Sequence, residues 1–343
     1  MANYTTINKS TDYFNTKLWT GNGGTQSITG VGFQSDFTWI KRRDAGNNHR
    51  LTDAVRGVEK EIYSDGNWAQ DTRTDGLTAF SADGFTIGNS SGYNGSGGTF
   101  ASWNWKANGA GSANTDGSIS STVSVNATSG FSIVKFTGTG SLATVGHGLG
   151  SAPKMIIMKN TNTTNGWEVY HQSLGNTGYI QLNSTETSYS SATRWNNTST
   201  TNNVFTVNTE NGVNKSGSTL IAYCFAEKTG YSKFGSYTGN GATFDNAFVY
   251  TGFKPSLLII KRTDTTSNWV IEDNKRAGYN QANYHLYPNL SNAEGTNYYT
   301  DFLSNGFKIR DNPADIGASG GSYIYMAFGQ SLVGSNNVPC TAR

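Results

Sequence analysis

Charged side chains are scarce in this sequence: Asp, Glu, Lys and Arg together make up 14% of its 343 residues, and the formal net charge is +2. Soluble domains usually carry charged side chains at about a quarter of their positions. The chain therefore has no basic face that could hold a phosphate backbone, and nucleic acid is excluded as an expected partner. The polar surface must instead come from the Ser, Thr and Asn residues between the apolar segments.

Cysteine and long apolar runs are also nearly missing. Cys224 and Cys340 are the only cysteines, which excludes a disulfide framework and a cysteine-based metal site. Cys224 lies in an alternating apolar segment, so we predict that it is a small buried hydrophobic residue. No stretch approaches the roughly 18 apolar residues of a membrane span, and the N-terminus lacks the apolar core of a signal peptide. We predict a protein made in a cytoplasm, with no membrane insertion and no export signal of its own.

The residues that usually carry catalysis are few and scattered. The four histidines, His49, His147, His171 and His285, show no metal-binding spacing, and no GxSxG nucleophile motif is present. His147 lies in a glycine turn, where a turn residue is favoured over a ligand or a base. Gly-rich segments such as "TGNGG" precede strands instead of opening helices, so they lack the geometry of a phosphate loop.

Two groups of carboxylates are the remaining candidates for chemistry. Glu59 and Glu61 in "VEKEIYSD" have the spacing of a glycosidase acid pair on one face of a strand. Asp65, Asp71 and Asp75 lie beside glycines, as the oxygen ligands of a calcium loop do. The glutamate pair does not recur in the repeats described below, and the aspartates lack the order of a calcium-binding loop. We therefore predict no catalytic residue, no bound cofactor and no metal site.

Glycine and aromatic residues are what the sequence contains in abundance: 42 Gly, 18 Tyr, 17 Phe and 8 Trp. With few helix-forming charge pairs, this composition is typical of many short strands joined by tight turns. One strand-like segment occurs three times, each time with a Ser-Gly turn at its start: "SGGTFASWNWKA" at 96–107, "SGSTLIAYCFAE" at 216–227 and "SGGSYIYMAFGQ" at 319–330. This recurrence predicts three copies of one module.

Other landmarks recur in the same order. Three apolar runs end in Lys41, Lys159 and Lys261, and a Gly-rich turn precedes each run. The lysines are spaced by about 100 to 120 residues, the size of a whole β-sandwich domain. We predict an all-β protein of three tandem antiparallel β-sandwich modules, jelly-roll or concanavalin-like. The expected modules are 1–107, 130–227 and 228–333, with a linker at 108–129 and a tail at 334–343.

The segments between the modules predict how they pack. The 108–129 segment is polar, rich in small residues and without periodicity, whereas the junction around Lys228 is short and aromatic. Modules two and three are therefore expected to pack together, with module one set apart.

The repeated strand of the second module, "TLIAYCFAE", has two apolar faces. Alternate residues point to opposite sides of a strand, which places Leu220, Ala222, Cys224 and Ala226 on one face and Ile221, Tyr223 and Phe225 on the other. Such a strand is predicted to be central and covered on both sides. Phe225 and Phe328 take the place of Trp105 in the other copies, so all three side chains are predicted to be buried.

Three stretches of the chain closely resemble a repeat found in structural proteins of tailed bacteriophages, mostly marine ones. The stretches are "SIVKFTGTGSLATVGHGLGSAPKMIIMKN", "AYCFAEKTGYSKFGSYTGNG" and "FVYTGFKPSLLIIKRTD". The resemblance covers the chain from about Trp19 to Val333. It implies tandem β-sandwich modules in a virion protein assembled in the cytoplasm of a bacterial host. It implies no established catalytic residues, so no site is carried over from the family.

Three functions from different classes remain open. We expect a non-enzymatic virion structural protein, displayed as a tail-associated appendage or a capsid-surface decoration, that contributes to host-surface attachment. The alternatives are a glycan-binding adhesin at a tail fibre tip and a glycanase that degrades surface polysaccharide. The expected partners are other virion proteins and a host surface glycan. A homo-oligomer is also expected, with a trimer favoured.

Exposed aromatic side chains are the expected contacts if a glycan is bound, because their faces stack on sugar rings. Aromatic residues at repeated positions are assigned to the fold instead. Trp195 lies in the loop "SATRWNNTST" and is not repeated, and Tyr93 also lies in a loop segment. These two residues are the candidate glycan contacts.

Overall fold

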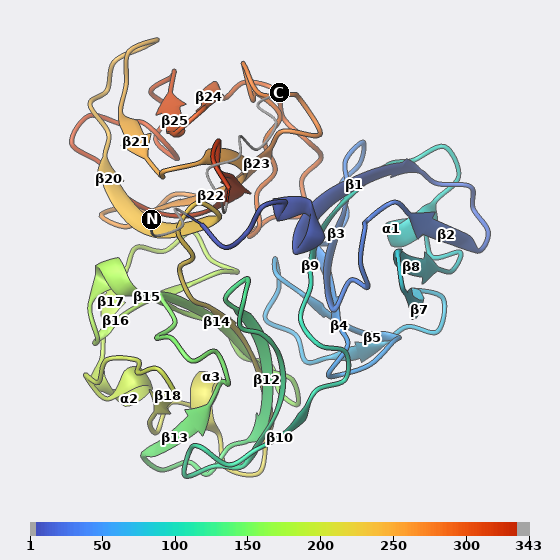
Figure 1. The fold of residues 1–343 in the computed structure, drawn as a ribbon, viewed down its shortest axis with the longest axis vertical. Helices are drawn as coiled ribbons and strands as arrows, with labels where there is room; N and C mark the ends of the chain where they lie inside the picture. The colour runs from blue at the N-terminus through green and yellow to red at the C-terminus, as the bar shows by residue number, and fades with distance from the viewer. Residues whose placement is uncertain (1–4, 335–343) are drawn as a thin grey trace.

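The computed structural model describes residues 5–334 and is built almost entirely of antiparallel strands (Figure 1). Its helical segments are single turns: α1 (Ser91–Asn94), α2 (Ala192–Trp195), α3 (Asn211–Asn214) and the 3-10 turns η1 (Ser10–Asp12) and η2 (Gln172–Leu174). No helix in the described part of the chain is long and apolar enough to span a membrane. The prediction of a β protein with almost no helix is confirmed, while the jelly-roll or concanavalin-like topology stays a prediction.

The strands form three pairs of sheets, which we call the first, second and third units. The large sheet of the first unit has the order β1-β9-β3-β4-β5-β6, and its small sheet has the order β2-β8-β7. The bounds are β1 (Phe14–Thr20), β2 (Gln26–Thr29), β3 (Phe37–Arg42), β4 (Arg50–Asp53), β5 (Lys60–Tyr63), β6 (Asp71–Thr72), β7 (Leu77–Ser81), β8 (Gly84–Ile87) and β9 (Thr99–Trp105).

The second unit has the sheet with the most strands, eight. Its large sheet has the order β10-β11-β12-β19-β14-β15-β16-β17, and β13 pairs with β18 in the small sheet. The bounds are β10 (Ser112–Asn114), β11 (Ser121–Asn126), β12 (Phe131–Thr137), β13 (Ala143–Gly146), β14 (Met155–Asn160), β15 (Glu168–His171), β16 (Gly178–Gln181), β17 (Tyr189–Ser190), β18 (Val204–Val207) and β19 (Thr219–Phe225).

The third unit repeats the plan with fewer strands. Its large sheet has the order β20-β26-β22-β23 and its small sheet the order β21-β25-β24. The bounds are β20 (Ser232–Thr238), β21 (Phe248–Tyr250), β22 (Lys254–Arg262), β23 (Trp269–Asp273), β24 (Thr300–Leu303), β25 (Gly306–Ile309) and β26 (Ser322–Gln330). Each of the three sheet pairs is consistent with one sandwich.

The three copies of the repeated strand are β9, β19 and β26, and each lies inside its large sheet. The Ser-Gly turn before each copy requires glycine, because Gly97, Gly217 and Gly320 all have φ near +70°, a conformation that side chains disfavour. In β19, Leu220 and Cys224 pack in the core between the two sheets of the second unit, while Ile221 and Phe225 pack on the opposite face. The prediction of a central strand covered on both sides is confirmed, as is the burial of Cys224. Cys340 lies outside the described residues.

Segment 108–129, predicted to be a linker, contains β10 and β11, which extend the large sheet of the second unit. Val123 alternates with polar residues in β11 and packs in the core of this unit, where it is 4% exposed. Ile119 packs in the same core and Val125 packs against it, so these apolar residues and the strand pairing together order the segment. The expectation of a free linker is corrected accordingly.

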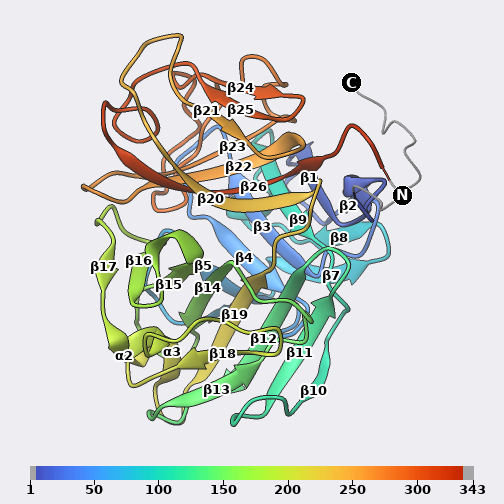
Figure 2. The same ribbon diagram turned by 60° about the vertical axis from the view of Figure 1, so that its left-hand side comes forward.

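All three large sheets turn their second face toward the centre of the molecule, where the units meet (Figures 1 and 2). Trp105, Phe225 and Phe328 contact one another there, with ring centroids 5.9 to 6.3 Å apart. Their predicted burial is confirmed, since each is 1% exposed. The central core contains side chains of every unit, so the expectation that the first module sits apart is corrected.

Candidate functional site

The two aromatic residues predicted to contact a glycan are both buried. Trp195 is 2% exposed, because α2 places its ring against Tyr170 and its Nε1 donates a hydrogen bond to the carbonyl of Gly178 at 3.2 Å. Tyr93 is 1% exposed, and its hydroxyl donates to Glu61 at 2.7 Å. Neither ring is accessible to a saccharide, so the expectation that these side chains are exposed is corrected.

The glutamate pair is divided between two environments. Glu61 lies in β5, is fully buried and accepts hydrogen bonds from Arg50 at 2.9 Å and from the hydroxyls of Tyr63 and Tyr93. Glu59 precedes the strand in a left-handed turn with φ of 64°. The two side chains do not share a strand face. Glu61 is fully occupied by structural hydrogen bonds.

Two further candidates, Asp65 and His147, have structural partners, whereas Asp71 is exposed. Asp65 accepts a hydrogen bond from the backbone N–H of His49 at 3.0 Å, and burial raises the pKa of Asp65 to about 6. The Nδ1 atom of His147 accepts from the backbone N–H of Leu149 at 3.2 Å, which holds the glycine turn. Within residues 5–334, no three His, Cys, Asp or Glu side chains are grouped so that they could hold a metal ion.

The three repeated lysines join the units into a closed ring. Each Nζ atom donates to one or two carbonyl oxygens of its own unit and to one carbonyl of a neighbouring unit. The contacts between units are Lys41 to Ser291 at 3.1 Å, Lys159 to Asn67 at 3.2 Å and Lys261 to Thr185 at 3.2 Å. Thus the first unit binds the third, the second binds the first and the third binds the second. Burial lowers the pKa of each lysine to about 8.

The same carbonyl oxygens also accept backbone hydrogen bonds across each junction. The pairs are Asn47 to Ser291 at 2.8 Å, Asn165 to Asn67 at 2.9 Å and Ser267 to Thr185 at 2.8 Å. A carbonyl oxygen has two lone pairs, so a lysine and a backbone N–H can share it. The three junctions therefore share one hydrogen-bond arrangement, in which a carbonyl oxygen accepts from a lysine and from a backbone N–H of the neighbouring unit.

A second set of contacts lies at the inner ends of β4, β15 and β23. Asp53 accepts from the hydroxyl of Tyr223 at 2.8 Å, and Asp273 accepts from Trp103 Nε1 at 3.0 Å. His171 holds the equivalent place in the second unit, with its Nε2 atom 3.2 Å from the carbonyl oxygen of Tyr325. These buried polar groups thus hold the units together.

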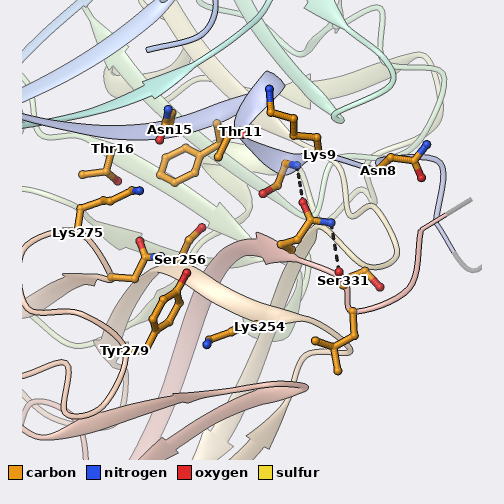
Figure 3. A pocket seen from close by; sticks show the side chains of 15 residues that line it. Asn8, Lys9, Thr11, Asn15, Thr16, Lys254, Ser256, Lys275, Tyr279 and Ser331 are labelled. Atoms are coloured by element: carbon orange, nitrogen blue, oxygen red, sulfur yellow. Dashed lines mark hydrogen bonds between the residues drawn. The ribbon is translucent and has the colours of Figure 1, made fainter. Parts of the chain in front are cut away.

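A groove of about 310 Å³ lies between the N-terminal segment of the first unit and the third unit (Figure 3). Gln330 closes one side, since its Oε1 atom accepts from the backbone N–H of Ser10 at 2.6 Å. The amino ends of Lys9, Lys254 and Lys275 lie at separate places around the groove in Figure 3. Lys254 Nζ lies 3.5 Å from the centre of the Tyr279 ring.

The lining of the groove is polar and carries positive charge. It contains no Asp or Glu among the described residues, although Asp12 pairs with Lys9 at 2.8 Å. The Thr16 hydroxyl is buried at the groove and has no hydrogen-bond partner within residues 5–334. Spaced ammonium, hydroxyl and amide groups can contact a hydroxylated or acidic ligand, but they do not form a catalytic arrangement.

Residues 9–331 match a single family, described as Domain of unknown function (DUF7483). The chain belongs to this family. The matched range includes all three units, so the family corresponds to the whole ring and not to one repeat. Searches among curated proteins and solved structures found no significant match.

The sequence identified the lysines as landmarks but did not assign them a role. Their repetition was the available signal, because a lysine at the end of an apolar run is unusual inside a sheet covered on both faces. The groove had no such signal, since its residues come from three separate segments of the chain, 8–16, 254–279 and 330–332.

Proposed function

We propose that the chain is a non-enzymatic structural protein of a tailed-bacteriophage virion, displayed as a tail-associated appendage or a capsid-surface decoration. In this proposal the protein contributes to attachment at the host surface. Its partners are other virion proteins, and its copies are arranged by the symmetry of the particle, with a trimer favoured. The resemblance of the repeats to phage structural proteins supplies the setting.

The closed ring is the observation that supports a structural role most directly. Three units share one core, and the same lysine contact recurs at every junction. The buried carboxylates of Glu61 and Asp273 are bound to arginine and aromatic partners of the fold. A compact body with little free backbone suits a protein that faces open water and proteases.

The location of the protein on the particle tests this proposal. Antibodies against the recombinant chain would be applied to phage particles grown in the host that supports them, and to particles lacking the gene as the control. We expect labelling of the tail or of the capsid surface by electron microscopy. Absence of the protein from purified particles, together with its presence in the soluble lysate, would overturn the proposal.

The non-enzymatic part is tested with host surface polysaccharide. We expect no new reducing ends after incubation with the purified chain. Release of reducing ends that is lost in Glu59→Gln or Glu61→Gln, with an unchanged circular dichroism spectrum, would instead favour a glycanase.

A further inference from the structure

Three large aromatic side chains are exposed in strand β21 of the third unit and in the segment that leads into it. Phe244 is 64% exposed, Phe248 48% and Tyr250 56%, whereas Val249 between the last two is buried in the unit's core. We call Phe244, Phe248 and Tyr250 the outer aromatic patch. Strand β21, which carries two of them, lies at the outer side of the third unit in both views (Figures 1 and 2).

The fold does not require aromatic residues at these positions, and the other two units show this directly. Val249 pairs with Phe307, just as Ile28 pairs with Phe85 and Val145 with Phe205. This register places Ser27 and Thr144 at the position of Phe248, and Thr29 and Gly146 at the position of Tyr250. Two copies of the same strand therefore form with small side chains there. Aromatic residues at the positions of Phe248 and Tyr250 are thus a property of the third unit alone.

The patch is held in place by its own contacts. Phe244 adopts φ of 68°, an unfavourable conformation for a bulky residue. Its backbone N–H donates to the carbonyl of Arg310 at 3.0 Å, and Arg310 Nη1 donates to the carbonyl of Phe244 at 2.8 Å. Arg310 is in turn paired with Asp301 at 3.0 Å. Backbone strain of this kind, with no burial to explain it, is typical of functional positions.

The strand opposite the patch approaches its backbone closely. Gly306 is opposite Tyr250, and a Cβ atom at Gly306 would collide with the carbonyl oxygen of Val249 and lie 3.1 Å from Cε2 of Phe248. Gly84 makes the same close approach in the first unit, so this glycine belongs to the shared fold. Phe248 is paired across the strands with Lys308, which bonds to Asp245. The result is an apolar platform with charged and hydroxyl groups at its rim.

The size of the patch decides which occupant it fits. Aromatic side chains bury about 150–250 Å² each, and these three are already partly covered, so together they offer roughly 250–400 Å². A stable contact with a second protein needs about 800 Å² from each partner. A few sugar rings need much less, and their apolar faces stack on aromatic rings while their hydroxyls contact a polar rim.

We propose that the outer aromatic patch is a saccharide-binding site, with Phe248 and Tyr250 stacking on the sugar rings. The site deepens the attachment role included in the proposed function, and it depends on that function for the source of the saccharide, a bacterial surface polysaccharide. It replaces the buried Trp195 and Tyr93 as the glycan contact.

The double variant Phe248→Ser with Tyr250→Thr tests the site, because it installs the residues that the first unit carries at the same positions. The probe is an array of immobilised bacterial lipopolysaccharides and capsular polysaccharides. We expect the wild-type chain to bind at least one of them, and the double variant to bind it about tenfold more weakly. Tyr189→Ala, which removes an exposed aromatic ring of the second unit, is the matched control and should leave binding unchanged.

Three results would overturn the site: no binding by the wild-type chain, equal binding by the double variant, or an equal loss in Tyr189→Ala. Light scattering on the same samples detects self-association, and its loss in the double variant would assign the patch to a second copy of the chain instead. The array contains no phage particles, so failure here is separate from failure of the labelling experiment on the virion.

Discussion

At the scale of single residues, the position of a side chain in the repeat decides what it does. Trp105, Phe225 and Phe328 share one position and meet at the centre of the ring. Phe248 belongs to a position that is polar in the other units, and it is exposed. Phe225 and Phe248 are the same type of residue, but Phe225 is buried at a position of the shared fold, whereas Phe248 is exposed at a position that the other units fill with small residues.

Phe225→Ala should lower the free energy of unfolding by about 3–5 kcal/mol, because it leaves a cavity among rings that cannot all move inward. Phe248→Ala is the matched control, since it removes the same ring from the surface and should change stability by less than about 0.5 kcal/mol. Denaturant unfolding of both variants provides the measurement. A loss under about 1 kcal/mol for Phe225→Ala would show that the centre of the ring is loosely packed.

At the scale of elements, the sequence predicted what depends on local pattern. The alternation in 219–225 is enough to identify a strand covered on both faces, and β19 has this structure. Trp195 could not be placed in the same way, because it lies in α2 and its burial depends on Tyr170, which lies in β15. The lysine contacts were hidden for a similar reason. Their acceptors lie 76, 92 and 250 residues away in the sequence.

At the scale of elements, we predict that segment 108–129 resists proteolysis. Because β10 and β11 are paired in the sheet, a broad-specificity protease should not separate the first unit from the other two. Val123→Asp should place a charge in the core of the second unit, release the segment and allow cleavage there. Gel electrophoresis after timed digestion compares the cleavage of the wild-type chain with that of Val123→Asp. Cleavage of the wild-type chain within 108–129 at the rate of the variant would mean that the strands are not stably paired.

At the scale of the whole molecule, the three buried lysines link stability to pH. Lysine in an unfolded chain has a pKa of about 10.4, whereas burial lowers it to about 8 for Lys41, Lys159 and Lys261. Between these values the unfolded chain binds more protons than the folded chain, so stability rises with pH. Burial raises the pKa of Glu272 from its ordinary value of 4.5 to about 8. Between these values the folded chain binds more protons than the unfolded chain, so this residue makes stability fall as pH rises.

The free energy of unfolding should therefore increase from pH 8 to pH 9 by about 1 kcal/mol for each lysine. Above about pH 10 it should fall, because buried tyrosines such as Tyr223 and Tyr231 have raised pKa values and ionise more easily in the unfolded chain. Guanidinium unfolding at several pH values measures both the rise and the fall of the free energy of unfolding. Lys159→Met should reduce the rise by about a third if the lysines cause it. An unchanged slope in this variant would assign the pH dependence to other groups.

The three units of the ring belong to one chain, and this changes how binding sites can be counted. In an assembly of three identical chains, a surface substitution appears three times and alters every lobe. Here Phe248 and Tyr250 stand in one lobe, while Ser27, Thr29, Thr144 and Gly146 remain at the matching places of the others. The stoichiometry of the outer aromatic patch is therefore one per chain, despite a threefold core. Any gain from multivalency must come from the number of chains on a particle and from the spacing between them.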